Sequence, residues 1–208
     1  MPSKVDPLIT NEVYHIYNRG VDKRVVFGDK KDYLRFYQSL HLFNSKDPVI
    51  NFDFARARFK NNQTLEKLVE FHAYSLLPNH FHLILKQCSD GGVGEFMRRL
   101  SLGYTSYFNQ RNDRSGSLFQ GTFKRVHVAT QEQYQYLFAY VNENHFVHNL
   151  DMVREICHSS SLHYQKLATS KLIDSSLTDQ YPFEANIDLA RSIYSRRQEK
   201  YITKSILE

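Results

Sequence analysis

The sequence has little cysteine, no tryptophan and no long apolar run. Cys88 and Cys157 are its only cysteines among 208 residues, too few for a disulfide framework or a cysteine-based zinc site, so we interpret them as reduced thiols. No apolar stretch reaches the roughly 18 residues that a membrane-spanning helix needs, and no signal-peptide pattern is present. These absences favour a cytoplasmic protein, and the polar segment Met1 to Pro7 is expected to be a short tail.

Internal repeats and low-complexity tracts are also missing. Hydrophobic residues make up 41% of the chain and aromatic residues 14%, with 14 Tyr and 15 Phe. This composition predicts one folded domain of ordinary size with a short appendage. Core packing is the simplest role for the aromatic side chains, although some of them could stack on nucleic-acid bases.

Basic charge is concentrated in one part of the chain. The formal net charge is +5 and the isoelectric point is about 9.1, which permits a polyanionic partner. Residues 91–128 hold six basic side chains against Glu95 and Asp113, a local net charge of +4. The six are Arg98, Arg99, Arg111, Arg114, Lys124 and Arg125. This stretch is either a phosphate-binding surface or an ordinary solvated face.

The hydrophobic pattern alternates between strand and helix periods. Strands are expected at Glu12–Tyr17, Phe71–Leu77, His80–Lys86 and Thr122–Val128. Helices are expected at Lys31–Phe43, at Val93–Gln110 and from Thr130, which begins the capping pattern Thr-x-x-Gln. The order β-α-β-β-α-β-α predicts an α+β, ferredoxin-like (RRM-like) antiparallel sheet with packed helices and one further helix after the fourth strand.

Shorter segments complete this prediction. Pro78-Asn79 is typical of a hairpin turn between the second and third strands. Ser45 to Gln63 is interpreted as a loop insertion, and Leu65–Val69 as a short helical turn. A weak helix is expected over Asn186 to Lys200, because apolar residues recur there at helical spacing.

The most informative motif is His80-Phe81-His82, inside a predicted strand. Side chains alternate across a strand, so the two imidazoles share one face, while Phe81, Leu83 and Leu85 share the apolar face. Two imidazoles at this spacing can bind one metal ion, although a polar surface pair has the same spacing.

A second motif lies on the helix that follows the fourth strand. Tyr140 and Asn144 are one turn apart on the same side of that helix, at the border of its packed face. A tyrosine phenol has a pKa of about 10 and is a weak nucleophile unless its target is activated. A divalent cation held by the two imidazoles and an amide oxygen would activate a phosphodiester. Tyr140 is otherwise an ordinary boundary tyrosine.

These motifs resemble those of a known family. His80-Phe81-His82, after Tyr74 to Asn79, resembles the HUH motif of single-tyrosine transposases, and most of all of the REP-associated tyrosine transposases, relatives of the transposases of the smallest bacterial insertion sequences. Further collinear blocks are Tyr14 to Gly20, Phe96 to Leu100, Tyr104 to Asn109, Ser115 to Gly121, Tyr140 to Asn144 and Ser160-Ser161.

The resemblance implies a catalytic domain at residues 8–164 and a C-terminal helical extension of unclear role at 165–208. It implies Tyr140 as the nucleophile and His80, His82 and Asn144 as ligands of Mg²⁺ or Mn²⁺. The activity would be nicking and rejoining of single-stranded DNA through a 5′-phosphotyrosine, on hairpins or palindromic repeats. Localisation would be cytoplasmic, at the bacterial nucleoid. The residues expected to contact DNA are Arg19, Arg98, Arg99, Arg111, Arg114, Lys124 and Arg125.

Two positions depart from the family's pattern. His145 stands where proline is usual, which makes it an alternative ligand or an extension of the helix, and Thr122 stands where a basic residue is common. Two other functions remain open: a ferredoxin-like domain that binds structured nucleic acid without cutting it, and a metal-dependent hydrolase that uses the histidine pair. Both a monomer and a homodimer are compatible with the sequence, and Tyr140 could act in its own subunit or in a partner.

Overall fold

The computed structural model of the protein describes residues 7–60, 66–144, 158–168, 170–173, 177, 188–192 and 194–196. The strands are β1 (Val13–Arg19), β2 (Val69–Leu77), β3 (His80–Gln87), β4 (Lys124–His127) and β5 (His158–Ser159). The helices are η1 (Val21–Lys23), α1 (Lys30–Leu42), α2 (Phe52–Lys60), α3 (Gly92–Arg111), α4 (Gln131–Asn142) and α6 (Ser161–Tyr164).

The strands form one antiparallel sheet in the order β4-β1-β3-β2-β5. Strands β1 to β4, with α1 between β1 and β2 and α3 between β3 and β4, follow the ferredoxin-like β-α-β-β-α-β succession. The α+β fold class predicted from the sequence is therefore confirmed, as is the helix after the fourth strand. The short β5 extends the sheet at the β2 edge.

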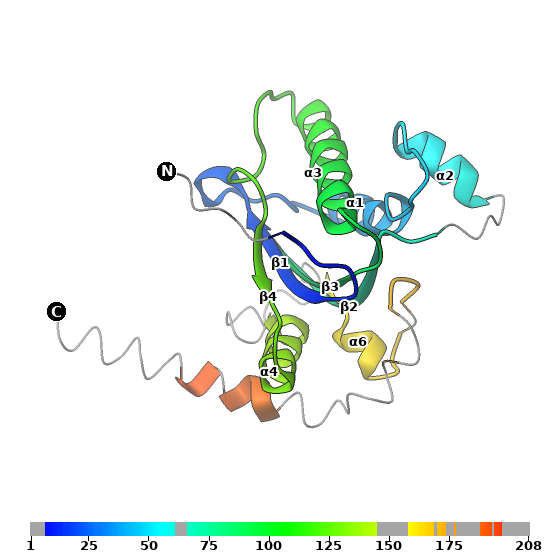
Figure 1. Ribbon diagram of the computed structural model, residues 1–208. Helices are drawn as coiled ribbons and strands as arrows, with labels where there is room; N and C mark the ends of the chain where they lie inside the picture. Colours follow the sequence, from blue (N-terminus) through cyan, green and yellow to red (C-terminus); the bar gives the residue numbers. More distant parts are fainter. Residues whose placement is uncertain are drawn as a thin grey trace, which may run out of the picture.

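Helices cover both faces of the sheet (Figure 1). Helices α1 and α3 lie on one face, and α4 and α6 lie on the other. The apolar side chains of β3 point toward α1 and α3, since the Phe81 ring is centred 5.2 Å from that of Phe36 on α1. Phe71 on β2 lies edge-on to Phe96 on α3. One part of the core thus lies between the sheet and α1/α3, and the cluster continues under α4, where Phe138 is fully buried. Polar side chains of β1 and β3 share this second face.

Two predictions for the segment between α1 and β2 are wrong. Residues 52–60 within the expected loop insertion form α2, because Phe52 and Ala55 are buried against Leu42 and Phe43 and the Asn51 side chain accepts a hydrogen bond from the Phe54 amide. The expected helical turn at Leu65–Val69 does not form in its described part. Val69 instead begins β2 and pairs with Gln87, because sheet pairing outweighs the local preference of so short a segment.

The region beyond residue 164 contributes to the same core. Leu172, Ile173 and Leu177 are buried in the main hydrophobic cluster, and Ile173 forms an isolated bridge with Phe71. Residues 188–192 and 194–196 are helical, within the predicted Asn186 to Lys200 helix, whose other residues lie outside the described part of the chain. The functional division at 8–164 and 165–208 stays a prediction.

Cys88 is a free thiol, and Cys157 lies outside the described residues. In the part of the chain that the structure describes, every helix is too short or too polar to cross a bilayer.

Candidate active site

The pairing of β1 with β3 brings a group of polar side chains onto the face that α4 covers. Tyr17 pairs directly with His82, and Arg19 pairs with His80. Directly opposed residues of an antiparallel pair project to the same side of the sheet. The His80 and His82 rings lie 5.1 Å apart, nearly perpendicular to each other. The shared face predicted from alternation in the sequence is therefore confirmed.

Hydrogen bonds orient both imidazoles. The Nδ1 atom of His80 lies 2.6 Å from the Asn79 side-chain oxygen, and Nδ1 of His82 lies 2.9 Å from Nε2 of His15. Because the Asn79 oxygen can only accept, His80 donates from Nδ1, and Nε2 carries its lone pair. Metal-binding histidines commonly donate their second ring nitrogen in this way, to a polar group that fixes the tautomer.

His15 has the protonation state that this arrangement requires. Its side chain is buried, and burial lowers the pKa of His15 to about 4, so the ring is neutral at neutral pH. A neutral ring protonated at Nδ1 accepts a hydrogen bond at Nε2, and we assign His82 Nδ1 as the donor. His82, like His80, then carries its lone pair on Nε2. His15 therefore contacts a candidate metal ligand directly.

Helix α4 places Tyr140 against the imidazoles. The helix begins at its cap, where the Thr130 side chain accepts a hydrogen bond from the Gln133 amide. One face of α4 packs on the sheet, and the Tyr140 ring lies 5.4 Å from the His82 ring and 6.4 Å from that of His15, nearly perpendicular to both. Tyr140 is 9% exposed, so it is more deeply buried than the border position predicted from the helical pattern.

Asn144 lies two residues beyond the end of α4 and is fully buried. Its Nδ2 donates a hydrogen bond of 3.3 Å to the Tyr140 carbonyl, whereas its Oδ1 is buried without a hydrogen-bond partner. A buried amide oxygen without a partner costs about 1–3 kcal/mol. A cation would remove this cost, so the orphaned oxygen fits the proposed third ligand.

The donor set is consistent with a divalent cation. Imidazole nitrogen and amide oxygen are both ligands of first-row divalent metals, although Mg²⁺ prefers oxygen. The described residues contain no cluster of three or more His, Cys, Asp or Glu that could hold a metal ion. Among the described residues, the candidate for a third ligand at the histidine pair is of another type, the Asn144 amide. His145, the alternative ligand, lies outside the described residues.

A cavity of about 470 Å³ opens beside the two imidazoles and Tyr140, and Asn144 is not among its lining residues. Its lining consists of Tyr17, Asn18, Arg19, Asn79, His80, His82, Gln120, Lys124 and Tyr140. Arg19 and Lys124 make the cavity positive, and the Nε of Arg19 is buried without a hydrogen-bond partner. A cavity with two cationic side chains, amides and a phenol suits an anionic ligand such as a phosphate group.

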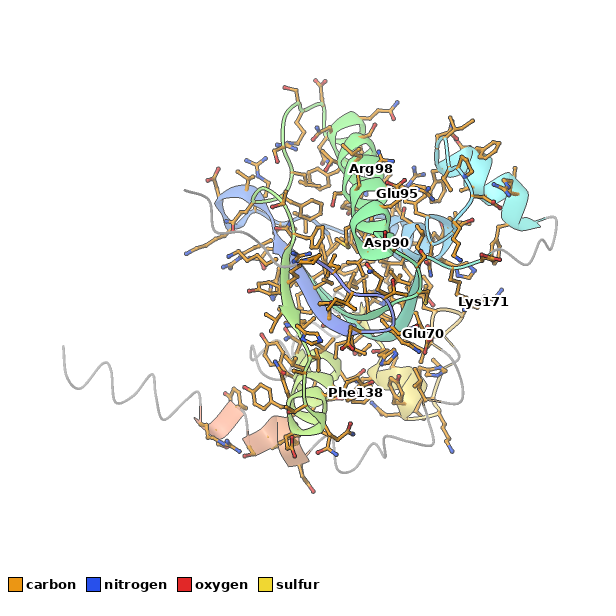
Figure 2. The ribbon with its side chains drawn as sticks, viewed as in Figure 1. Glu70, Asp90, Glu95, Arg98, Phe138 and Lys171 are labelled. Carbon is orange, nitrogen blue, oxygen red and sulfur yellow. The ribbon has the colours of Figure 1, made fainter. Side chains whose placement is uncertain are left out.

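The other predicted DNA contacts lie elsewhere. Arg98 and Arg99 form ion pairs with Glu95 on α3, across the sheet from Phe138 of α4 (Figure 2). Arg111 pairs with Asp29 and Asp32, and Arg114 donates to Asn109 and to the Ser117 carbonyl. Arg125 pairs with Ile16 in the β1–β4 register, so it projects to the opposite face from Lys124. Of the seven predicted basic residues, only Arg19 and Lys124 line the cavity.

Four lining residues were not singled out from the sequence as site residues: Tyr17, Asn18, Asn79 and Gln120. For Tyr17 the strand alternation was an available signal, because it pairs with His82. Gln120 reaches the cavity from a loop that turns at Gly121, whose φ of 70° is in the left-handed region that favours glycine. The Gln120 amide donates to the Arg19 carbonyl, a long-range contact that has no local sequence pattern.

Among known proteins, a solved structure shows a distant likeness to this chain. No protein-family model and no curated protein matches the sequence. One similar solved structure is described as a REP-associated tyrosine transposase bound to a REP hairpin. It is 13% identical, the alignment covers 85% of this chain and 96% of that one, and the TM-score is 0.43. This likeness is a distant one.

Proposed function

We propose that this protein is a metal-dependent, single-tyrosine strand transferase that nicks and rejoins single-stranded DNA. The observation that carries the proposal is the Tyr140 ring, which lies 5.4 Å from the His82 ring and lines the same positive cavity as His80. The buried, unpartnered Oδ1 of Asn144, tied by its amide nitrogen to the Tyr140 carbonyl, supports a cation beside the phenol.

Three groups of residues would have separate roles in this reaction: metal binding, phosphate binding and orientation of the imidazoles. A divalent cation, Mg²⁺ or Mn²⁺, held by His80, His82 and Asn144 would polarise the scissile phosphate as a Lewis acid. Arg19 and Lys124 would hold the phosphate oxygens by charge-assisted hydrogen bonds. His15 and Asn79 keep the two imidazoles in the tautomer that presents Nε2.

The chemical step is a transesterification. The Tyr140 hydroxyl oxygen bonds to phosphorus, and the bond between phosphorus and the 3′ oxygen breaks. The phenol loses its proton to solvent, and the leaving oxygen gains one to become a free 3′-OH. One phosphodiester replaces another, so the 5′-phosphotyrosine can be reversed by a DNA 3′-OH without an external energy source. Hairpins and palindromic repeats are the substrates that we propose.

The test is covalent trapping. The protein is incubated with a hairpin-bearing single strand and Mn²⁺, and a denaturing gel is read for a protein–DNA product. The wild type is expected to form this product and the Tyr140→Phe variant to lose it while still binding DNA. Tyr136→Phe is the matched control, because Tyr136 lies on the same helix but is 39% exposed.

Other outcomes would point to other functions. Product formed by Tyr140→Phe would exclude Tyr140 as the nucleophile. Cleavage by the wild type without a covalent product would favour the metal-dependent hydrolase. DNA binding that is indifferent to a chelator, with no cleavage, would favour the non-catalytic binding domain.

A further inference from the structure

The end of the helix that carries Tyr140 is held by residues from a later part of the chain. Ser160 donates a hydrogen bond of 2.6 Å to the Asn142 side-chain oxygen, and Ser161 donates one of 2.5 Å to the Glu143 carboxylate. All four side chains are buried. Two hydroxyls from one segment thus contact two consecutive residues at the C-terminal end of α4.

The segment that supplies these hydroxyls is itself attached to the sheet. Strand β5 pairs with β2 through Ser75 and Ser159. Ser160 then exchanges hydrogen bonds with the Tyr74 backbone, because its amide donates to the Tyr74 carbonyl and its Oγ accepts from the Tyr74 amide, both at 2.9 Å. The Tyr164 hydroxyl donates to the His72 carbonyl. Ser160 therefore links the edge of the sheet directly to α4.

Apolar contact and a second polar contact hold the rest of the helix. The Phe138 ring packs edge-on against Tyr164 of α6, with centroids 4.7 Å apart. Nearer the start of α4, the Tyr134 hydroxyl lies 2.8 Å from Nδ1 of His72 on β2. The helix is thus held against the sheet near both ends, and the two serine hydroxyls are part of its C-terminal attachment.

The clamped residues lie between the two site residues in the sequence. Tyr140 and Asn144 are one turn apart and share one side, whereas Asn142 lies about 160° from Tyr140 on the opposite side and Glu143 lies about 60° from it, at the flank. Holding Asn142 from behind and Glu143 at the flank therefore fixes the rotation of the chain that presents Tyr140 and Asn144. Without this hold, the phenol and the amide oxygen would sample other angles relative to the imidazoles.

We propose that Ser160 and Ser161 are positioning residues, which hold the end of α4 so that Tyr140 and Asn144 face the histidine pair. This inference rests on the proposed function, and it adds a role for a segment that contributes no side chain to the cavity lining. It explains why hydroxyl groups occupy both positions, since alanine would leave the buried Asn142 oxygen and Glu143 carboxylate without these donors.

The test uses Ser161→Ala in the full-length protein, with Ser39→Ala as the matched control. Ser39 is a fully buried serine whose hydroxyl donates to the Arg35 carbonyl on α1, across the sheet from α4. Ser161→Ala is expected to lower the rate of covalent product formation roughly 10- to 100-fold, because small displacements of reacting groups have effects of this size. Its DNA affinity is expected to stay unchanged, and Ser161→Thr is expected to recover the rate.

Two readouts separate positioning from loss of stability. Measured well below the unfolding temperature, the Mn²⁺ concentration for half-saturation is expected to rise about 10-fold in Ser161→Ala and to stay unchanged in Ser39→Ala. Amide hydrogen exchange is expected to increase in α4 and not in α3. Ser160→Ala is a second variant, which removes the Ser160 hydroxyl that contacts both the Asn142 side chain and the Tyr74 amide. The changes in Mn²⁺ affinity and in α4 hydrogen exchange are expected to be larger in this variant.

The outcomes decide the two proposals separately. If the wild type forms no covalent product, the proposed function fails, and Mn²⁺ affinity and hydrogen exchange still test the clamp. If Ser161→Ala matches Ser39→Ala in Mn²⁺ affinity, α4 exchange and product formation, the positioning role is wrong, whatever the wild type does to DNA.

Discussion

Replacing His15 with phenylalanine tests whether the histidine pair is a metal site. The substitution keeps an aromatic ring in the stack with Tyr17, whose centroid lies 5.0 Å from that of His15, but it removes the acceptor 2.9 Å from Nδ1 of His82. In this variant His82 Nδ1 loses the His15 acceptor, or the His82 proton moves to Nε2, the nitrogen that would bind the metal. Either change weakens metal binding.

The expected size of the effect follows from two independent arguments. An unsatisfied buried donor costs about 1–3 kcal/mol, and a tenfold loss of affinity corresponds to about 1.4 kcal/mol. Loss of a partner behind a metal ligand typically lowers metal affinity about 10- to 100-fold. We therefore expect Mn²⁺ to bind His15→Phe about 10- to 100-fold more weakly than the wild type.

Isothermal titration of Mn²⁺ into the DNA-free protein measures this difference. His15→Gln, whose amide oxygen can accept from His82, is expected to recover most of the affinity. His127→Phe is the control. His127 lies at the end of β4, pairs with the exposed Glu12 and does not line the cavity. Equal Mn²⁺ affinity in His15→Phe and the wild type would refute the assigned tautomer and the role of His15.

Three further predictions concern separate features. Asn144→Leu is expected to abolish Mn²⁺ binding without lowering the unfolding free energy of the metal-free protein, because it removes a buried unpartnered oxygen. Denaturant unfolding with and without Mn²⁺ measures both quantities. Unaltered Mn²⁺ binding would exclude Asn144 as a ligand. A mixture of Tyr140→Phe and His82→Ala chains is expected to form no covalent product, because each chain brings its own Tyr140 and His82 rings within 5.4 Å; recovery of product in the mixture would show that the phenol acts on a partner subunit. Hydrogen bonds from Arg98, and then from Arg99, lower the pKa of Glu95 to about 2, so its stabilising contribution is complete above its ordinary pKa of 4.5 and is lost as the pH falls toward 2. The Glu95 side chain is partly exposed, so this contribution is small. Between about pH 6 and pH 3, the unfolding free energy of the wild type is expected to fall further than that of Glu95→Gln, by about 1 kcal/mol or less. Equal decreases in the two proteins would contradict the ion-pair assignment.

Local pattern alone predicted much of the framework. The period of two in His80-Phe81-His82 determined that the imidazoles share a face, and the helical period determined that Tyr140 and Asn144 share a side. The segment order predicted the α+β class and the helix after β4. These predictions succeeded because periodicity determines how side chains project from their own helix or strand, whatever the surroundings.

Contacts between distant residues decided the rest. The His15–His82 hydrogen bond, the burial of the Asn144 oxygen, the short helix α2 and the attachment of α4 by Ser160 all depend on segments that are far apart in the sequence. The basic residues of 91–128 show how sequence grouping and spatial grouping differ. They are neighbours in the sequence, but in the fold Lys124 lines the cavity while Arg98 and Arg99 form ion pairs with Glu95. Residue type and spacing determined which groups the chain carries and how each points from its own backbone. Only the pairing of strands and the packing of α4 on the sheet determined which of these groups meet, because those distances are set by interactions between elements and not within them.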